Sequence, residues 1–194
     1  MKDFDIEQKI NHSEKIQWKG KPEKKAFFLK SVFNIFLPIA VVWAIIDFSF
    51  ISRFINDVDG RFFVIPFFIL HLMPVWMYLF GIISSLLRFR HTEYVVTDQA
   101  IYISGGAFTI NVERKPLVRI SNVSIRSGII ERMSKVGSIV IDDGDTSYRN
   151  NNSRMGTSFA ILYVQEPEEV FNKINKLQST AFSDTMYPNQ YRPQ

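Results

Sequence analysis

The sequence predicts two units of different fold class: an α-helical membrane hairpin, and an α+β domain in which a curved antiparallel sheet is covered by one C-terminal helix. Two observations support this division. Apolar residues are concentrated between positions 26 and 87, whereas the flanking segments have the composition of ordinary soluble protein. From His91 onward the apolar residues alternate with polar ones, which is the pattern of β-strands with one buried face.

Residues 26–88 are predicted to form the hairpin, with helices at about 26–51 and 62–87. Twenty helical residues extend over about 30 Å, the thickness of the hydrocarbon layer, and both runs are longer than that. The second run contains no formally charged residue, and Pro66 and Pro74 are expected to kink it. A buried helix of a soluble protein would show a polar face over this length, so we expect both runs to span a membrane.

The distribution of positive charge predicts the orientation of the hairpin. The short connection carries Arg53 against Asp57 and Asp59, whereas the other side carries a cluster of Lys and Arg. By the positive-inside rule both termini are expected to be cytoplasmic, in a multi-pass protein of the inner (cytoplasmic) membrane. Cations there can attract anionic lipid head groups non-specifically. The predicted membrane-interface anchors are Trp18, Lys21, Lys24, Lys25, Lys30, Arg88 and Arg90.

Two polar residues, Asp47 and His71, are predicted to lie within the membrane. Asp47 is three residues from the outer end of the first helix, so its carboxylate is expected to reach the interface. His71 is expected near mid-membrane, bonded to a backbone carbonyl or to another subunit. Counting back from Phe50 places Asp47 about 9 Å too shallow to pair with His71, which argues against a proton relay.

The N-terminal segment, residues 1–25, alternates acidic residues with lysines and lacks the pattern of a signal peptide, so we expect it to be cytoplasmic. The absence of cysteine excludes disulfides and Cys-ligated metal centres. A net charge of +4, without a stripe of cations interleaved with aromatics, gives no support for nucleic-acid binding.

The α+β domain is predicted over residues 91–178, followed by a disordered tail at 179–194 and interrupted by a polar loop at 143–157. A helical spacing of Ile129, Ile130, Met133 and Val136 is closed by Gly137. The last helix begins at Pro167 and has an apolar face of Val170, Phe171, Ile174 and Leu177. The expected strands are Glu93–Thr97, Ala100–Ser104, Phe108–Val112, Val123–Arg126, Ser138–Asp142 and Ser158–Val164.

Four stretches, in this order, resemble the bacterial pleckstrin-homology-like family, often described as membrane-flanked domains, and in particular its two-transmembrane-helix members. The resemblance covers nearly the whole chain apart from residues 1–13 and the tail. It implies a PH-like fold, an antiparallel sandwich or open barrel capped by a C-terminal helix, and the polar loop departs from it. The stretches are Glu14 with Trp18-Lys19-Gly20-Lys21-Pro22, then Glu93-Tyr94-Val95-Val96-Thr97-Asp98, then Pro116-Leu117-Val118-Arg119-Ile120-Ser121-Asn122-Val123, and finally Gly128-Ile129-Ile130-Glu131-Arg132 with Val136-Gly137.

The sequence offers no catalytic constellation, so we expect neither an enzyme nor a cofactor or metal site. Its three histidines have no nucleophile pattern beside them, and phosphate-binding glycine motifs are missing. The acidic run at 142–145 lacks the ligand spacing of a calcium loop. Lipid-reading PH domains place Lys or Arg between their first two strands, and here the expected turn is Thr97-Asp98-Gln99, so specific inositide binding is not expected.

Two functions fit these features. In the first, the protein is a membrane-anchored, non-enzymatic scaffold or sensor whose domain presents a cytoplasmic surface, for instance a strand edge, to a protein or to a second copy in a homo-oligomer. In the alternative, it is an accessory subunit of a transport or envelope-processing complex and contacts its membrane protein partner through the hairpin.

Overall fold

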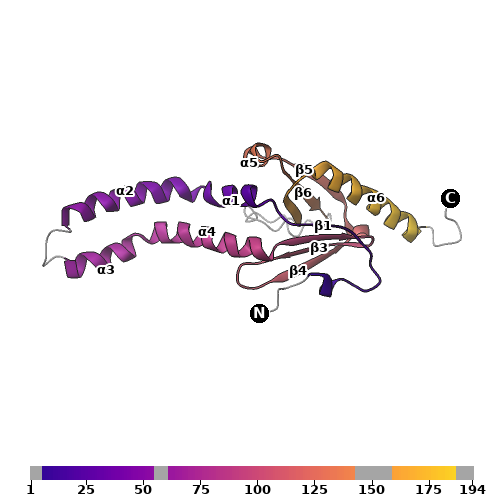
Figure 1. The fold of residues 1–194 in the computed structure, drawn as a ribbon, viewed down its shortest axis with the longest axis horizontal. Coiled ribbons are helices and arrows are strands. Elements are labelled where there is room, and N and C mark those ends of the chain that lie inside the picture. Colours follow the sequence, from indigo (N-terminus) through magenta and orange to yellow (C-terminus); the bar gives the residue numbers. More distant parts are fainter. Residues whose placement is uncertain (1–5, 55–60, 143–158, 187–194) are drawn as a thin grey trace. The chain divides into compact units, whose positions relative to one another are not determined.

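The computed structural model describes residues 6–54, 61–142 and 159–186, and the chain divides into two compact units. The helical unit is Phe28–Leu87. The sheet unit combines Met1–Phe27 with Arg88–Gln194, so the helical unit is an insertion in the sequence of the sheet unit (Figure 1).

Each of the two apolar runs forms a broken helix. The first run gives α1 (Lys24–Val32) and α2 (Phe36–Phe54), and the second gives α3 (Arg61–His71) and α4 (Met73–His91). Among the described residues no single helix has both the length and the hydropathy of a membrane span. Lys24–Val32 and Phe36–Ile51 meet these criteria as a pair, with a bend of 51° between them. Each of the two expected helices is therefore divided at a break, and the spanning of a membrane by both runs stays a prediction.

Asparagine and proline explain the two breaks. The side chain of Asn34 donates to Ser31 O (2.7 Å) and accepts from the Phe36 N–H (2.8 Å), so it bonds the end of α1 and the start of α2. Pro38 has no N–H to donate to Asn34 O, which removes a bond that a continuous helix needs. Pro74 breaks the second run in the same way, and Pro66 is accommodated inside α3.

The sheet unit contains two antiparallel sheets. The four-stranded sheet has the order β1-β2-β3-β4 and the three-stranded sheet the order β5-β6-β7. The short helical turn η1 (Ile6–Lys9) precedes the first strand, whereas η2 (Leu117–Arg119) and α5 (Ile129–Met133) lie between strands. The helix α6 (Pro167–Met186) ends the described chain. The strands are β1 (Ile16–Gly20), β2 (Glu93–Thr97), β3 (Ala100–Gly105), β4 (Asn111–Pro116), β5 (Asn122–Arg126), β6 (Gly137–Asp142) and β7 (Ala160–Val164).

The first strand was not expected. β1 lies in the segment predicted as a plain N-terminal extension, and it pairs antiparallel with β2, with Ile16 opposite Thr97 and Gly20 opposite Tyr94. The sheet therefore begins before the helical unit rather than at residue 91. The turn Thr97-Asp98-Gln99 joins β2 to β3, the first two strands after the helical unit. The absence of specific inositide binding stays a prediction.

The fourth strand was expected three residues too early. Phe108 is 72% exposed and lies before β4, because the chain turns at Gly106. The φ of Gly106 is 134°, and a Cβ there would collide with the Thr109 carbonyl oxygen, so the turn requires glycine. Pro116 belongs to β4 rather than ending it, since β4 is last in the strand order and an edge strand tolerates proline.

The C-terminal helix was predicted correctly in place and in its buried face. Val170 and Ile174 of α6 are buried in the main core, and Phe171 and Leu177 pack against it. The helix contacts β5, β6 and η2. It continues to Met186, so the prediction of a disordered tail from residue 179 is wrong for its first part, and residues 187–194 lie outside the described residues. The predicted polar loop at 143–157 also lies outside them.

Candidate functional site

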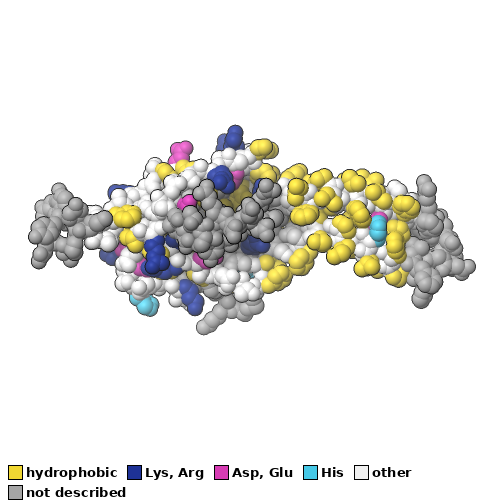
Figure 2. Space-filling view, turned by 180° about the vertical axis from the view of Figure 1, so that it is seen from behind, with side chains coloured by type: hydrophobic (Ala, Val, Ile, Leu, Met, Phe, Trp, Pro, Cys, Tyr) yellow, Lys and Arg dark blue, Asp and Glu magenta, His cyan; other side chains and the backbone are white. Residues whose placement is uncertain are grey.

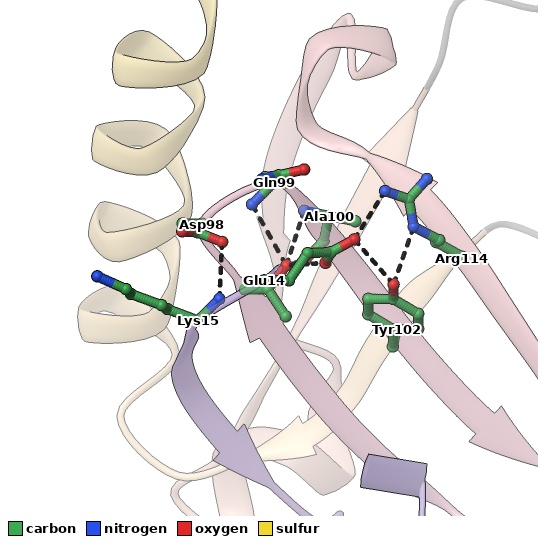
Figure 3. Close-up of polar contacts among 8 residues, drawn as sticks. Glu14, Lys15, Asp98, Gln99, Ala100, Tyr102 and Arg114 are labelled. Carbon is green, nitrogen blue, oxygen red and sulfur yellow. Dashed lines mark hydrogen bonds and ion pairs between the residues drawn. The ribbon is translucent and has the colours of Figure 1, made fainter. Parts of the chain in front are cut away.

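A buried carboxylate, Glu14, ties the N-terminal segment to the four-stranded sheet (Figure 3). Its Oε1 accepts hydrogen bonds from the Tyr102 hydroxyl at 3.0 Å and from Arg114 Nη2 at 2.9 Å, and the second of these is also an ion pair. Its Oε2 lies 2.6 Å from the Thr97 hydroxyl. Arg114 Nε also donates to the Tyr102 hydroxyl oxygen at 2.9 Å, which closes the network.

The pKa shifts of Glu14 and Arg114 indicate that the network stabilises the fold. Burial raises the pKa of Glu14, but hydrogen bonds from Thr97, Arg114 and Tyr102 outweigh burial and hold the pKa below its ordinary value. The hydrogen bond to Glu14 raises the pKa of Arg114. Both carboxylate oxygens are hydrogen-bonded and Glu14 is buried, as is usual for a buried carboxylate with a structural role.

The main chain adds a second link at the same place. The Lys15 N–H donates to Asp98 Oδ1 at 3.0 Å, and the Asp98 N–H donates to Lys15 O at 3.1 Å (Figure 3). Sequence reasoning singled out Glu14 only as part of a motif and missed Tyr102 and Arg114. Nothing local marks these two residues, because they lie 88 and 100 positions from Glu14.

The other residues of the stretch that contains Glu14, from Trp18 to Pro22, make packing contacts and ion pairs within the sheet unit. The Trp18 indole packs against the main core and lies over Gly20, where a Cβ would overlap the ring. Pro22 and Glu23 line a shallow hollow of about 400 Å³ between the ends of β1 and β7. Its polar groups are paired, since Lys21 bonds Glu93 at 2.7 Å and Glu23 accepts from Gln165 at 3.0 Å. The hollow therefore shows no convergent free groups that would bind a ligand.

Among the described residues of the helical unit, His71 and Asp47 form a polar pair. His71 Nδ1 lies 2.8 Å from Asp47 Oδ1, and the Asp47 carboxylate is buried. The imidazole stacks between Trp43 and Phe67, each with its ring centroid 5.2 Å away. Trp43 Nε1 donates to His71 O at 2.7 Å, an oxygen released from the helix because Val75 N bonds Leu72 O instead.

This pair corrects the sequence prediction that Asp47 was too shallow to reach His71. The count assumed a first helix that ended near Phe50, whereas α2 continues to Phe54. The end of the first helix is therefore farther from Asp47 than the count assumed, and the two side chains are in contact. The second oxygen of Asp47, Oδ2, is buried without a hydrogen-bond partner among the described residues.

The predicted interface anchors are found in three elements. Trp18 lies in β1 and Lys21 follows it, Lys24, Lys25 and Lys30 lie in α1, and Arg88 and Arg90 lie in the last turn of α4. Their role at a membrane interface stays a prediction.

In the described part of the chain no group of three or more His, Cys, Asp or Glu is arranged to hold a metal ion. The acidic run at 142–145 lies almost entirely outside the described residues.

Comparison with known families agrees with the architecture. The model of the bacterial PH domain family matches residues 24–178, and the family is not known to be catalytic. The match begins after β1, so the structure adds a first strand to the matched region. Searches of curated proteins and of solved structures gave no match. Two antiparallel sheets closed by a C-terminal helix, together with a match over most of the sequence, show that this chain belongs to the bacterial PH domain family.

Proposed function

We propose that this protein is a membrane-anchored, non-enzymatic PH domain protein. Its helical unit inserts in the cytoplasmic membrane as a hairpin with both termini in the cytoplasm, and its sheet unit presents an interaction surface to a protein partner or to a second copy of the chain. The observation that carries the proposal is the opposite burial of apolar side chains in the two units.

In the helical unit large apolar side chains are exposed on α2, α3 and α4, and Figure 2 shows them along the visible face of these helices. Phe48 is 74% exposed and Leu70 is 76% exposed. Continuous apolar exposure of this kind is unfavourable in water and is favourable in a bilayer. The bent pair α1 and α2 has the length and hydropathy of a span, which supports insertion of the first half.

The sheet unit, in contrast, has a complete core of its own. Its buried cluster draws on both sheets and on α6, including Tyr94, Ile139 and Ile174. The helical unit is inserted in the sequence between β1 and β2, and all seven described strands belong to the sheet unit. Both sheets therefore form without residues of the helical unit. Insertion at one connection interrupts the sequence of the sheet unit only between β1 and β2, and loops of such domains commonly carry binding sites, which supports a presenting role.

Strand edges are the surface that we assign to protein contact. β4 and β5 each lie at one end of the strand order of their sheet, and half of the residues of β4 and most of those of β5 are exposed. An edge strand offers backbone donors and acceptors to an added strand, which is a common mode of peptide binding and self-association.

The alternative, an accessory subunit that uses Asp47 and His71 to contact its partner, receives no support from the geometry. These two side chains bond each other within the helical unit, and Asp47 is 1% exposed.

The topology is testable with single cysteines, since the chain has none of its own. Asn172→Cys places a thiol at an exposed position of α6. In intact spheroplasts we expect a membrane-impermeant maleimide to leave this thiol unmodified, and in inside-out vesicles to modify it. Labelling in intact spheroplasts would reject the cytoplasmic assignment.

Self-association is tested by crosslinking in membranes, followed by size determination of the solubilised complex. A monomer without crosslinks would reject self-association.

A further inference from the structure

The short helix α5 exposes apolar side chains that its sequence spacing places on one face. The spacing of Ile129, Ile130, Met133 and Val136 predicts a short helix with one apolar face. In the structure Val136 is buried and Ile130 is partly covered, but Ile129 is 78% exposed and Met133 is 73% exposed. Figure 1 shows α5 standing out from the edge of the three-stranded sheet. Ile125 at the end of β5 is 38% exposed and belongs to the same stretch of chain.

The exposed position of α5 is held by specific contacts rather than by loose packing. The Glu131 carboxylate accepts from the Gly128 N–H and from the Ser138 hydroxyl, the latter at 2.9 Å. At the other end Val136 N donates to Glu131 O at 2.9 Å, and Lys135 adopts a φ of 53°, the left-handed conformation that commonly ends a helix. The two exposed side chains are therefore presented by a defined turn.

The charge around this tip is strongly biased. Arg126, Arg132 and Lys135 are all exposed, and none forms an ion pair within the described residues. The only acid from Ile125 to Lys135 is Glu131, which is partly buried and engaged at the start of the helix. The segment thus has three positive charges and one negative charge, a net charge of +2, with the negative charge turned inward.

We infer that α5 is a second membrane contact: Ile129 and Met133 insert into the interface of an anionic bilayer, while Arg126, Arg132 and Lys135 bind its phosphate head groups. An apolar tip surrounded by cations suits the boundary between head groups and acyl chains, because that boundary accepts both kinds of side chain. Each Lys or Arg near an anionic surface is expected to favour the docked state about fivefold.

Tethering makes such a weak contact effective. This inference rests on the proposed membrane anchorage, since a chain held at the bilayer by its helices meets the lipid surface at a high effective concentration. Docking of α5 would then fix which face of the sheet unit is turned to the membrane and which strand edges stay open to partners.

The test uses the full-length chain in lipid nanodiscs. Met133→Cys is labelled with an environment-sensitive fluorophore, and Asn172→Cys on α6, labelled in the same way, is the matched control. We expect blue-shifted emission from position 133 in discs of phosphatidylcholine mixed with phosphatidylglycerol, and unshifted emission in phosphatidylcholine alone. Position 172 should give the same unshifted emission in both lipids.

Charge variants test the head-group contact. Arg126→Gln with Arg132→Gln, in the labelled Met133→Cys background, should lower the docked-to-undocked ratio by a factor on the order of 20, and high salt should have a similar effect. Lys176→Gln on exposed α6 is the control and should change nothing. Far-UV circular dichroism checks that each variant is folded.

Two outcomes would overturn the inference. Emission from position 133 that is equal in both lipids would reject lipid contact. A blue shift that appears only when a disc holds more than one copy would assign the patch to a second copy of the chain. The experiment also distinguishes the contact of α5 from the membrane anchorage on which it rests. If the chain does not enter the discs, both the anchorage and the α5 contact are rejected. If it enters the discs but shows no lipid-dependent shift, only the α5 contact is rejected.

Discussion

The helical unit and the sheet unit place the same kinds of side chain in opposite environments. In the sheet unit Ile139 and Ile174 are fully buried, whereas Ile45 of the helical unit is 60% exposed. The same contrast holds for buried acids. Glu14 accepts hydrogen bonds from three side chains, whereas Asp47 has one side-chain partner among the described residues and one oxygen with none there. The sheet unit thus buries its large apolar side chains in a core, whereas the helical unit exposes many of them.

Matched isoleucine substitutions give the largest expected difference between the units. Ile139→Ala should lower the free energy of unfolding by about 2–5 kcal/mol, because it leaves a cavity in a closed core. Ile45→Ala in the helical unit should cost less than about 1 kcal/mol when measured in the same detergent, since most of the side chain is already outside. Thermal unfolding followed by circular dichroism measures both. Equal losses would mean that Ile45 is a core residue.

Removing the charge of Glu14 is expected to have the next largest effect. Glu14→Gln keeps the shape of the side chain and loses the ion pair with Arg114, at a cost of about 1–3 kcal/mol. The cost stays below that of a fully buried pair, because Arg114 is 42% exposed and water can solvate it. Glu7→Gln, which affects the exposed pair with Lys19, is the control and should cost no more than about 1 kcal/mol. If both variants lost equally little, Glu14 would not anchor the N-terminal segment.

The same residue predicts how stability changes with pH. The pKa of Glu14 is lower in the folded chain than its ordinary value, so the unfolded chain takes up the proton first as the pH falls. The contribution of Glu14 is complete above the unfolded value of about 4.3 and is lost as the pH falls through the lower folded value. Denaturant unfolding between neutral and acidic pH should show a steeper loss for wild type than for Glu14→Gln. Parallel curves would contradict the assigned shift.

The smallest expected effect concerns the Asp47–His71 pair. A double-mutant cycle with Asp47→Ala and His71→Ala should give a coupling energy of about 0.6 kcal/mol, with an upper limit of about 1.7 kcal/mol, the range found for polar pairs between membrane helices. Unfolding in mixed micelles measures the four free energies. A coupling energy of zero would show that the 2.8 Å contact contributes nothing to the hairpin.

Local sequence patterns predicted the elements that have strong local signals. β2, β6 and α6 appear within two residues of their predicted starts, because alternation, glycine punctuation and acidic residues in the first helical turn are readable in short windows. What failed depends on distant partners. β1 is mostly exposed and pairs with a strand more than 70 residues away, so its own sequence carries little signal.

The candidate sites divide along the same line. Glu14 was noticed, but its partners Tyr102 and Arg114 come from other strands and could not be found by spacing. The Asp47–His71 pair was missed because its prediction depended on where a helix ends, and helix ends are the least certain feature of a pattern. The exposed face of α5 was missed because helical spacing shows that a face is apolar without showing what covers it.

The most direct test of the account is alkaline extraction of membranes that contain the full-length chain, followed by flotation on a density gradient. If the helical unit is inserted in the bilayer, the protein stays with the lipid after carbonate treatment and floats with it. If the apolar side chains exposed on α2, α3 and α4 are covered by protein instead, carbonate releases the chain into the supernatant, and the proposed membrane anchorage is rejected.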